Sequence, residues 1–175
     1  LRAARFAAEK HRHQRRKDAD ASPYINHPLG VATVLALDGG VVEETLLVAA
    51  LLHDTVEDTE TTLSELEEVF GATVRHLVEE VTDDTSLPKD RRKALQIEHA
   101  PLISPEAKLL KIADKICNVR DIAESPPADW SRERKNEYLE WTEKVVAGCR
   151  GVNPTLDVVY DATLAAARNK RDMEG

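Results

Sequence analysis

The hydrophobic residues of this 175-residue chain recur at the three- and four-residue spacing that is typical of amphipathic helices. The clearest run contains Leu63, Leu66, Val69, Phe70, Val74, Leu77, Val78 and Val81. Thr62 and Glu65 have the spacing of a capping box at the start of this run, and we expect Gly71 to divide it into two short helices. No stretch alternates apolar and polar residues for long enough to indicate a sheet.

Three more helices have recognisable start signals. In each, a residue that can cap a helix N-terminus precedes a periodic apolar run, and two of the three have a proline at the first helical position. These signals are Ser104-Pro105, Ser131 and Asn153-Pro154. Neither a linker nor an internal repeat interrupts the pattern. The sequence therefore predicts an all-α fold, a compact bundle of about eight to ten helices that forms one domain over residues 1–175.

The charge balance narrows the classes of partner. The chain has 32 Asp and Glu residues against 24 Lys and Arg residues, a formal net charge of −8. A nucleic-acid polymer or an anionic membrane surface would select clustered positive charge, so we expect neither as partner. The longest apolar run, Leu46–Leu52, is far shorter than a membrane span. Cys117 and Cys149 are interpreted as reduced thiols and no signal peptide is visible, so we expect a cytoplasmic protein.

The segment Leu46–Leu52 leads directly into four residues that bind metals or transfer protons, His53, Asp54, Glu57 and Asp58. On a helix, His53 and Glu57 are four positions apart, as are Asp54 and Asp58, so these groups lie within about one turn. Three crowded carboxylates repel one another, and a divalent cation removes that repulsion. Imidazole beside carboxylate suits Mn, Fe or Zn. The alternative interpretation is a solvated acidic helix end with an isolated histidine.

Two other segments favour the metal interpretation. His27 stands just before a proline, where a helix can begin, and Asp114 lies on a largely apolar helix with Asn118 four residues further on. Alone, His27 would be read as a surface or capping histidine, and Asp114 as the partner of a neighbouring lysine. Together with His53 and Asp54, they form a two-His, two-Asp set from three helices that leaves positions open for water and substrate.

The order H…HD…D is that of the HD-domain metal-dependent phosphohydrolases, and longer strings resemble the RelA/SpoT hydrolase domain. These strings are HRHQRRKDADASPYINHPLGV, AALLHDTVEDT, VEEVTDDTSLPK, KIADKICNVRD and NEYLEW. Within that family the chain resembles the stand-alone small alarmone hydrolases of the metazoan SpoT-homologue type, from about Phe6 to about Leu164. One departure is His13, which stands where relatives have a small or amide residue.

The resemblance implies a set of site residues. It implies one Mn²⁺ per chain bound by His27, His53, Asp54 and Asp114, with Glu57 and Asp58 as the catalytic acidic pair. The substrate-binding residues that it implies are Arg16 on the base, Asn118 near the ribose, and Lys89, Arg134 and Tyr138 toward phosphate and sugar. Arginine can stack on a purine and fork onto phosphate, which lysine cannot.

The implied reaction is removal of the 3′-pyrophosphate from guanosine tetra- or pentaphosphate, (p)ppGpp, which gives GDP or GTP. Eukaryotic members also suggest NADPH, which would lose its 2′-phosphate to give NADH. Phosphate-ester hydrolysis requires a nucleophilic water, a Lewis acid and groups that neutralise developing charge. Glu57 or Asp58 can move the proton if neighbouring carboxylates raise its pKa.

Several alternatives stay open. NADPH 2′-phosphatase could be the main activity, or the chain could hydrolyse another nucleotide as a deoxynucleotidase or cyclic-dinucleotide phosphodiesterase; the YINHP and HDTVEDT strings weigh against the latter. A non-catalytic alarmone-binding regulator would normally lack a metal ligand or the acidic pair, whereas all six residues are present. The oligomeric state is open. Lys111 and Lys115 are interpreted as charge balance beside the site or as reaching solvent, and Asp83-Asp84 as a helix-ending turn without a catalytic role.

Overall fold

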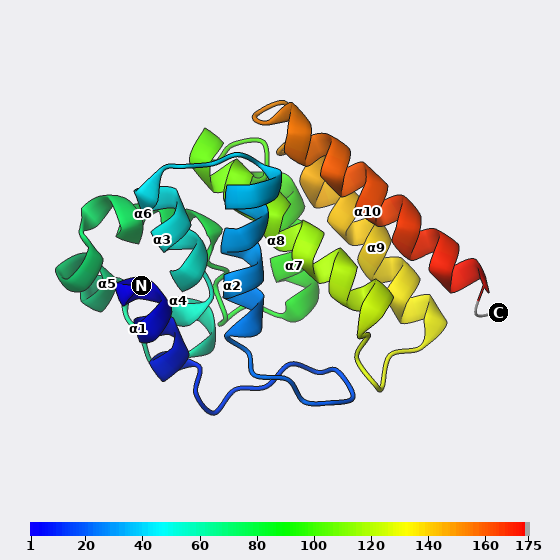
Figure 1. Cartoon of the computed structure of the whole chain (residues 1–175), viewed down its shortest axis with the longest axis horizontal. Helices are drawn as coiled ribbons and strands as arrows, with labels where there is room; N and C mark the ends of the chain where they lie inside the picture. The colour runs from blue at the N-terminus through cyan, green and yellow to red at the C-terminus, as the bar shows by residue number, and fades with distance from the viewer. Residues whose placement is uncertain (174–175) are drawn as a thin grey trace.

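A computed structural model describes the backbone of residues 1–173 and the side chains of residues 1–170 (Figure 1). Its elements, in chain order, are α1 (Arg2–Lys10), α2 (Asn26–Thr33), the π-helix η1 (Val34–Asp38), α3 (Glu44–Leu52), α4 (Thr55–Asp58), α5 (Leu63–Phe70), α6 (Ala72–Val81), α7 (Lys89–His99), α8 (Pro105–Glu124), α9 (Arg132–Ala147) and α10 (Pro154–Met173). Within residues 1–173 there is no strand, although Arg15 and Pro23 form an isolated antiparallel bridge. The predicted all-α fold is confirmed.

Helix α3 lies inside the molecule because it is apolar on every side. Leu46, Ala49, Ala50 and Leu52 are buried, and α3 packs against α1, α2, α6 and α8. A helix of this kind cannot end at the surface without exposing apolar residues. The polar residues that follow it, beginning with His53, are therefore held in the interior.

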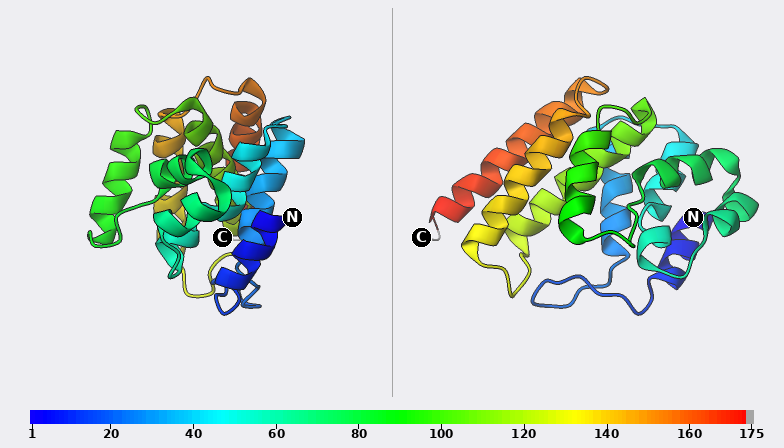
Figure 2. Two further views of the ribbon diagram at one scale, coloured as in Figure 1. Left: turned by 90° about the vertical axis from the view of Figure 1, so that its left-hand side faces the viewer. Right: turned by 180° about the vertical axis from the view of Figure 1, so that it is seen from behind.

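Helix α8 is a long helix against which most of the other helices pack. It packs against α2, α3, α6, α9, α10 and η1 (Figures 1 and 2). Its fully buried apolar residues include Ile112, Ala113, Ile116 and Val119. Helices α9 and α10 lie beside one another along one side of α8, where the hydroxyls of Thr142 and Tyr160 are 2.9 Å apart. None of the helices within residues 1–173 is long and apolar enough to span a bilayer.

The predicted helix boundaries are confirmed by hydrogen bonds from backbone amides to side-chain oxygens. These bonds are Glu65 N–H to Thr62 (3.1 Å), Ala107 N–H to Ser104 (3.1 Å), Arg134 N–H to Ser131 (3.2 Å) and Leu156 N–H to Asn153 (3.1 Å). Gly71 separates α5 from α6 with φ of +88°, a left-handed conformation that glycine adopts without steric cost. Local capping chemistry therefore sets where these helices begin.

Two connections meet at one edge of the bundle. The segment 11–25, which links α1 to α2, runs along that edge and approaches the 125–131 connection between α8 and α9 (Figure 1). The amide of Ala128 donates a hydrogen bond of 3.2 Å to the carbonyl of Lys17. The C-termini of α1 and α8 are thus linked through segments more than a hundred residues apart in sequence.

Replacing Ser104 tests whether capping stabilises the long helix. Ser104 Oγ accepts a hydrogen bond from Ala107 N–H and donates one of 2.6 Å to Glu80 Oε2. Ser104→Ala therefore removes the helix cap and also the hydrogen bond to Glu80 Oε2. We expect the free energy of unfolding in urea to fall by about 1–2 kcal/mol. Ser64→Ala, at an exposed position in the first turn of α5, is the matched control and should change the free energy of unfolding by less than about 0.5 kcal/mol. Equal effects would contradict the capping role.

Candidate active site

The HDTVED segment forms a corner, which corrects the expectation of one continuous helix. Helix α3 ends at Leu52 and α4 begins at Thr55. The buried hydroxyl of Thr55 donates a 2.7 Å hydrogen bond to the carbonyl of Leu52. In a continuous helix that carbonyl would accept from a backbone amide of the next turn. One turn of spacing survives, because Asp58 N–H donates to the Asp54 carbonyl at 2.9 Å. The corner places His53 and Asp54 between the end of α3 and the start of α4.

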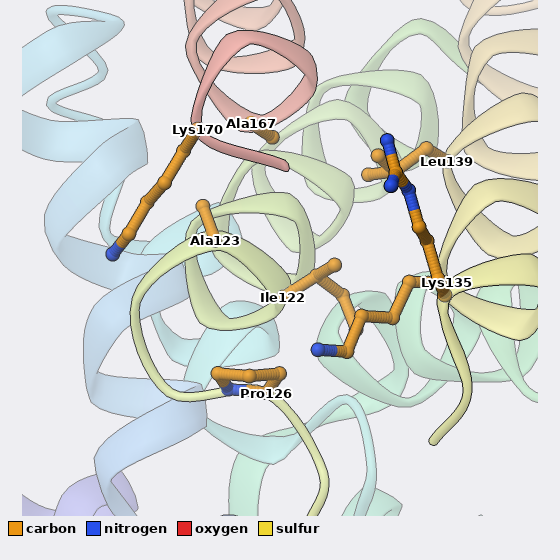
Figure 3. A pocket seen from close by; sticks show the side chains of 8 residues that line it. Ile122, Ala123, Pro126, Lys135, Leu139, Ala167 and Lys170 are labelled. Carbon is orange, nitrogen blue, oxygen red and sulfur yellow. The ribbon is translucent and has the colours of Figure 1, made fainter. Parts of the chain in front are cut away.

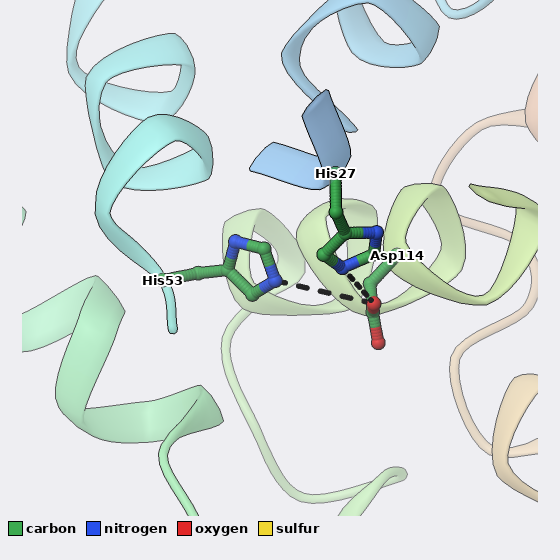
Figure 4. A group of neighbouring side chains, drawn as sticks. All are labelled: His27, His53 and Asp114. Atoms are coloured by element: carbon green, nitrogen blue, oxygen red, sulfur yellow. Dashed lines mark ion pairs between the residues drawn. The ribbon is translucent and has the colours of Figure 1, made fainter. Parts of the chain in front are cut away.

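Three helices bring the predicted metal ligands together. His27 lies in the first turn of α2, the His53-Asp54 corner follows α3, and Asp114 lies in the middle of α8 (Figure 4). Ligand atoms of His27, His53 and Asp114 are all within 4.8 Å of one another. Asp54 Oδ2 lies at the edge of these atoms, 3.2 Å from His53 Nε2 and 3.6 Å from His27 Nε2. We call these four residues the ligand group.

The chemistry of these atoms fits a divalent cation. His53 Nδ1 is 2.8 Å from the Ala50 carbonyl, an arrangement that orients the ring and directs Nε2 toward the ligand group. Within the described residues, Nε2 of His53 is buried and makes no hydrogen bond, although Asp54 Oδ2 lies 3.2 Å away. HD domains bind divalent metals, and two imidazoles with two carboxylates match that preference.

The charges of the ligand group are coupled. Burial opposes the charged form of His53, but Asp54 and Asp114 outweigh it and raise the pKa of His53 to about 9. Burial would raise the pKa of Asp114, yet Lys115 and His27 hold it well below its usual value. Lys115 Nζ donates to Asp114 Oδ2 at 2.8 Å, and Asn118 Nδ2 donates to Oδ1 at 2.6 Å. The carboxylates are therefore ionised and oriented before a metal binds.

Tyr24 is a site residue that the sequence did not single out. Its hydroxyl donates a 2.7 Å hydrogen bond to Asp54 Oδ2. Burial and the charge of Asp54 raise the pKa of this phenol, so it stays a donor. Tyr24 is the first residue of the YINHP string, so the sequence did contain a signal for it. Its hydrogen-bond partner, however, lies thirty positions away and is determined by tertiary structure.

Glu57 is held beside the ligand group by two residues, one after α6 and one on α7. Its carboxylate accepts from Asp83 N–H at 3.2 Å and from Arg92 Nη1 at 3.1 Å. Gln96 in turn donates to Asp83 Oδ2 at 2.6 Å. Burial, followed by the charges of Asp83 and Asp54, raises the pKa of Glu57 to about 7. Arg92 was not predicted, and Asp83 does more than end a helix.

Asp58 lines a different pocket from Glu57. Gln14 Nε2 donates to Asp58 Oδ2 at 2.9 Å, and Asp58 borders a cavity of about 360 Å³. Glu57 borders the adjoining metal pocket of about 150 Å³. The residues that line both pockets are Arg16, Tyr24 and Asn118. The two pockets are therefore neighbours, and each is lined by one member of the acidic pair.

The larger cavity collects most of the predicted substrate-binding residues. Arg16, Lys89, Asn118 and Tyr138 all line it. Arg134 is not among the lining residues; its guanidinium lies 4.6 Å from the ring centroid of Trp130, which lines the cavity. Lys93 also lines it, and its Nζ lies 5.6 Å from the ring centroid of Tyr138. Trp130 and Lys93 were not predicted as site residues.

Arg16 lies at the junction of the two pockets. It forms an ion pair with Asp121, its Nη2 is 3.4 Å from Asn118 Oδ1, and its guanidinium lies 5.5 Å from the Tyr24 ring centroid. These contacts hold a flat cation beside the cavity, as base stacking requires. His13, the departure from the family pattern, is exposed and accepts from Arg12 Nε at 3.0 Å.

A separate pocket of about 150 Å³ lies between α8, α9 and α10 (Figure 3). Its lining consists of apolar residues with three cations, namely Ile122, Ala123, Pro126, Arg132, Lys135, Leu139, Ala167 and Lys170. None of the predicted site residues lines it. We assign it no part in the candidate site.

The fold and the site define a class of protein. The chain belongs to the HD-domain family, which matches residues 3–141. Guanosine-3′,5′-bis(diphosphate) 3′-pyrophosphohydrolase MESH1 of Xenopus tropicalis is 57% identical over 161 residues, which cover 92% of this chain and 90% of that protein. The human protein of the same name is 58% identical over 157 residues, covering 90% of this chain and 88% of that one.

A solved structure agrees with this assignment. It is described as a metazoan orthologue of SpoT that hydrolyses ppGpp, and it superposes with a TM-score of 0.92 at 46% identity. The match covers 94% of this chain and 92% of that one. The resemblance to the metazoan SpoT-homologue hydrolases is thereby confirmed.

The raised pKa of His53 predicts proton release when metal binds. Below about pH 9 the metal-free imidazole is protonated, and a metal ligand must be neutral. Binding of Mn²⁺ at pH 7 should therefore release about one proton, measured as the dependence of calorimetric enthalpy on buffer ionisation enthalpy. His76→Gln, at an exposed histidine, should release the same number. A binding enthalpy independent of the buffer would show that His53 is already neutral.

Proposed function

We propose that this protein is a Mn²⁺-dependent hydrolase of (p)ppGpp that yields GDP or GTP and pyrophosphate. The observation that carries the proposal is the convergence of two histidines and two aspartates from three helices beside Glu57, a carboxyl whose pKa is about 7. The names of the MESH1 relatives and the high TM-score to a SpoT orthologue support the choice of substrate.

His27, His53, Asp54 and Asp114 would hold the metal. When bound, it supplies a Lewis acid and lowers the pKa of a bound water to about 7. Lys115, Asn118 and Tyr24 support the two aspartates through hydrogen bonds, so the ligands need little rearrangement. The choice of Mn²⁺ over other divalent ions rests on the family resemblance.

Glu57 is assigned the proton transfer. A carboxylate with a pKa near 7 is a far better base than an ordinary glutamate, because general-base catalysis is most efficient when the pKa is close to the working pH. Arg92 and the Asp83 amide fix both carboxylate oxygens of Glu57. Glu57 takes the proton of the attacking water, and Asp58 borders the nucleotide cavity, where Gln14 orients it.

The 360 Å³ cavity would receive the nucleoside and its 5′-phosphates. Its volume is within the range of small-molecule sites. In this assignment Arg16 stacks on the guanine, Asn118 lies near the ribose, and the remaining predicted residues provide cations and a phenol for phosphate and sugar, namely Lys89, Arg134 and Tyr138. An overall charge of −8 does not oppose such a ligand, since the cavity is lined by five lysines and arginines against three aspartates.

NADPH is the second candidate substrate, which would lose its 2′-phosphate to give NADH. Trp130 lies 5.3 Å from Tyr138 between ring centroids, and both line the cavity with Lys93. This aromatic and cationic wall could accept the second ring and phosphate of a dinucleotide. A non-catalytic alarmone-binding regulator has less support, because the metal ligands and the acidic pair are assembled together.

We also infer that residues 1–175 act as a single HD-type unit. Helix α10, which lies beyond the matched residues 3–141, packs along α8 and buries Leu156, Tyr160 and Leu164, while residues 174–175 lie outside the described part. The free, buried thiols of Cys117 and Cys149 support a reducing, cytoplasmic location.

Product analysis tests the proposed reaction. With Mn²⁺, ppGpp should yield GDP and pyrophosphate, and chelation should abolish the release. Asp54→Ala should lower the rate by more than about 100-fold, because it removes a metal ligand. Asp161→Ala, at an exposed ion pair on α10, is the matched control.

The same assay with NADPH separates the alternatives. Orthophosphate from NADPH without pyrophosphate from ppGpp would replace the proposed substrate. Alarmone binding without metal-dependent release from either compound would instead indicate the regulator.

The pKa of Glu57 predicts a pH dependence. If Glu57 is the base, only its ionised form is active, so kcat should rise with pH through a midpoint at or below about 7, lower with the cation bound. Glu57→Gln should lower kcat by about 10²–10⁴-fold, whereas Glu60→Gln, at an exposed glutamate, should not. A rate that falls as pH rises through this range would assign Glu57 as an acid instead.

A further inference from the structure

Lys111 is a buried cation that has no role in the proposed mechanism. Lys111 is 7% exposed, so of the two interpretations offered for it, charge balance beside the site or reaching solvent, the second is wrong. It lies on α8 one turn before Asp114 and lines the metal pocket. Among the described residues it has no ion pair; its hydrogen bond to the Val81 carbonyl is long, at 3.4 Å.

The neighbouring cations all have carboxylate partners. Arg16 pairs with Asp121, Arg92 with Glu57, and Lys115 with Asp114. Burial and then the charge of Lys115 lower the pKa of Lys111, so its surroundings disfavour the cation as they stand. A buried, unpaired charge is costly unless a ligand completes its interactions. Lys111 is therefore the cation of this pocket that is free to receive an anion.

The order of residues along α8 indicates which anion. Asn118, Asp114 and Lys111 are four and three positions apart, so they lie along one side of the helix over about 10 Å. Asn118 borders the nucleoside cavity, Asp114 belongs to the ligand group, and Lys111 is at the opposite end. A substrate that places its nucleoside near Asn118 and its reacting phosphate at the ligand group directs anything beyond that phosphate toward Lys111.

The space beyond the metal pocket supports this direction. A further cavity of about 180 Å³ shares Val81, Gln96 and Lys111 with the metal pocket. Its other charged or titratable lining residues are Glu80, Asp83, Asp84, Arg92 and His99. Lys111 therefore lines two neighbouring cavities, the metal pocket and the one beyond it. A single phosphate at the ligand group would not extend this far, whereas a pyrophosphate has a second phosphate to place there.

We propose that Lys111 binds the distal phosphate of the pyrophosphate group and so makes the site selective for pyrophosphate esters over simple phosphate esters. This inference rests on the proposed function for the identity of the substrate. In this reaction water attacks the phosphorus at the ligand group, and the bond from that phosphorus to the 3′-oxygen of the nucleoside breaks. Lys111 then acts on the pyrophosphoryl group that is transferred to water, whose negative charge its ammonium neutralises through charge-assisted hydrogen bonds.

Binding of inorganic anions tests the inference without turnover. Calorimetry on the Mn²⁺-loaded protein should show that Lys111→Met weakens pyrophosphate binding by about tenfold or more, while orthophosphate binding changes by less than about twofold. Lys111→Arg should keep most of the affinity for pyrophosphate. Lys108→Met is the matched control, because Lys108 Nζ donates to the Pro101 carbonyl and lines neither pocket. Equal changes for the two anions, or no change for pyrophosphate, would overturn the role.

Thermal unfolding of the metal-free protein separates ligand binding from a structural role. Val81 is the last residue of α6, so Lys111 could instead cap that helix. If the cation awaits a ligand, Lys111→Met should raise the melting temperature by about 2–4 °C, since methionine fills similar space without charge. A lower melting temperature would assign Lys111 to capping and overturn the inference.

Substrate assays distinguish this inference from the proposed function. Lys111→Met should lower kcat/KM for ppGpp by about tenfold or more and that for NADPH by less than about twofold. If the unmodified protein does not hydrolyse ppGpp, the proposed function fails, while the comparison of pyrophosphate with orthophosphate still decides whether Lys111 recognises a second phosphate.

Discussion

The structure depends on burying a group of charges between three helices. An apolar helix, α3, ends inside the molecule, and the two residues after it are a histidine and an aspartate. Ionised groups are tolerated in an interior only where partners compensate them. The histidines and aspartates come from α2, from the turn after α3 and from α8, so these three helices must all pack correctly before the charges are balanced. The same packing forms the core and orders the site.

The compensation is arranged in layers around the two aspartates. Lys115 and Asn118 hold Asp114 from within α8, and Tyr24 holds Asp54 from the segment before α2. A further layer, Arg92 with the Asp83 amide, holds Glu57 from outside. Because each layer fixes the group it surrounds, the ligand geometry does not depend on a bound metal to create it.

Local signals in the sequence predicted the parts of this structure that local chemistry determines. Capping residues such as Ser104 specify helix starts because their hydrogen bonds span three residues. The metal-ligand set was predicted from residue types and order, and the substrate-binding residues from family resemblance. The corner at Thr55, the Arg92–Glu57 pair and the isolation of Lys111 could not be predicted. Each depends on which elements pack together, and the periodicity of apolar residues in the sequence does not determine that.

The division between the two pockets has an evolutionary consequence. Glu57 and Asp58 are adjacent in a single-turn helix, and one residue step on a helix is a rotation of about 100°. That rotation directs neighbouring carboxylates to separate compartments, one with the ligand group and one with the nucleoside cavity. Substitutions that reshape the nucleoside cavity away from the shared residues Arg16, Tyr24 and Asn118 therefore leave the reacting centre intact. A lineage could change the nucleotide that it recognises while inheriting its chemistry unaltered.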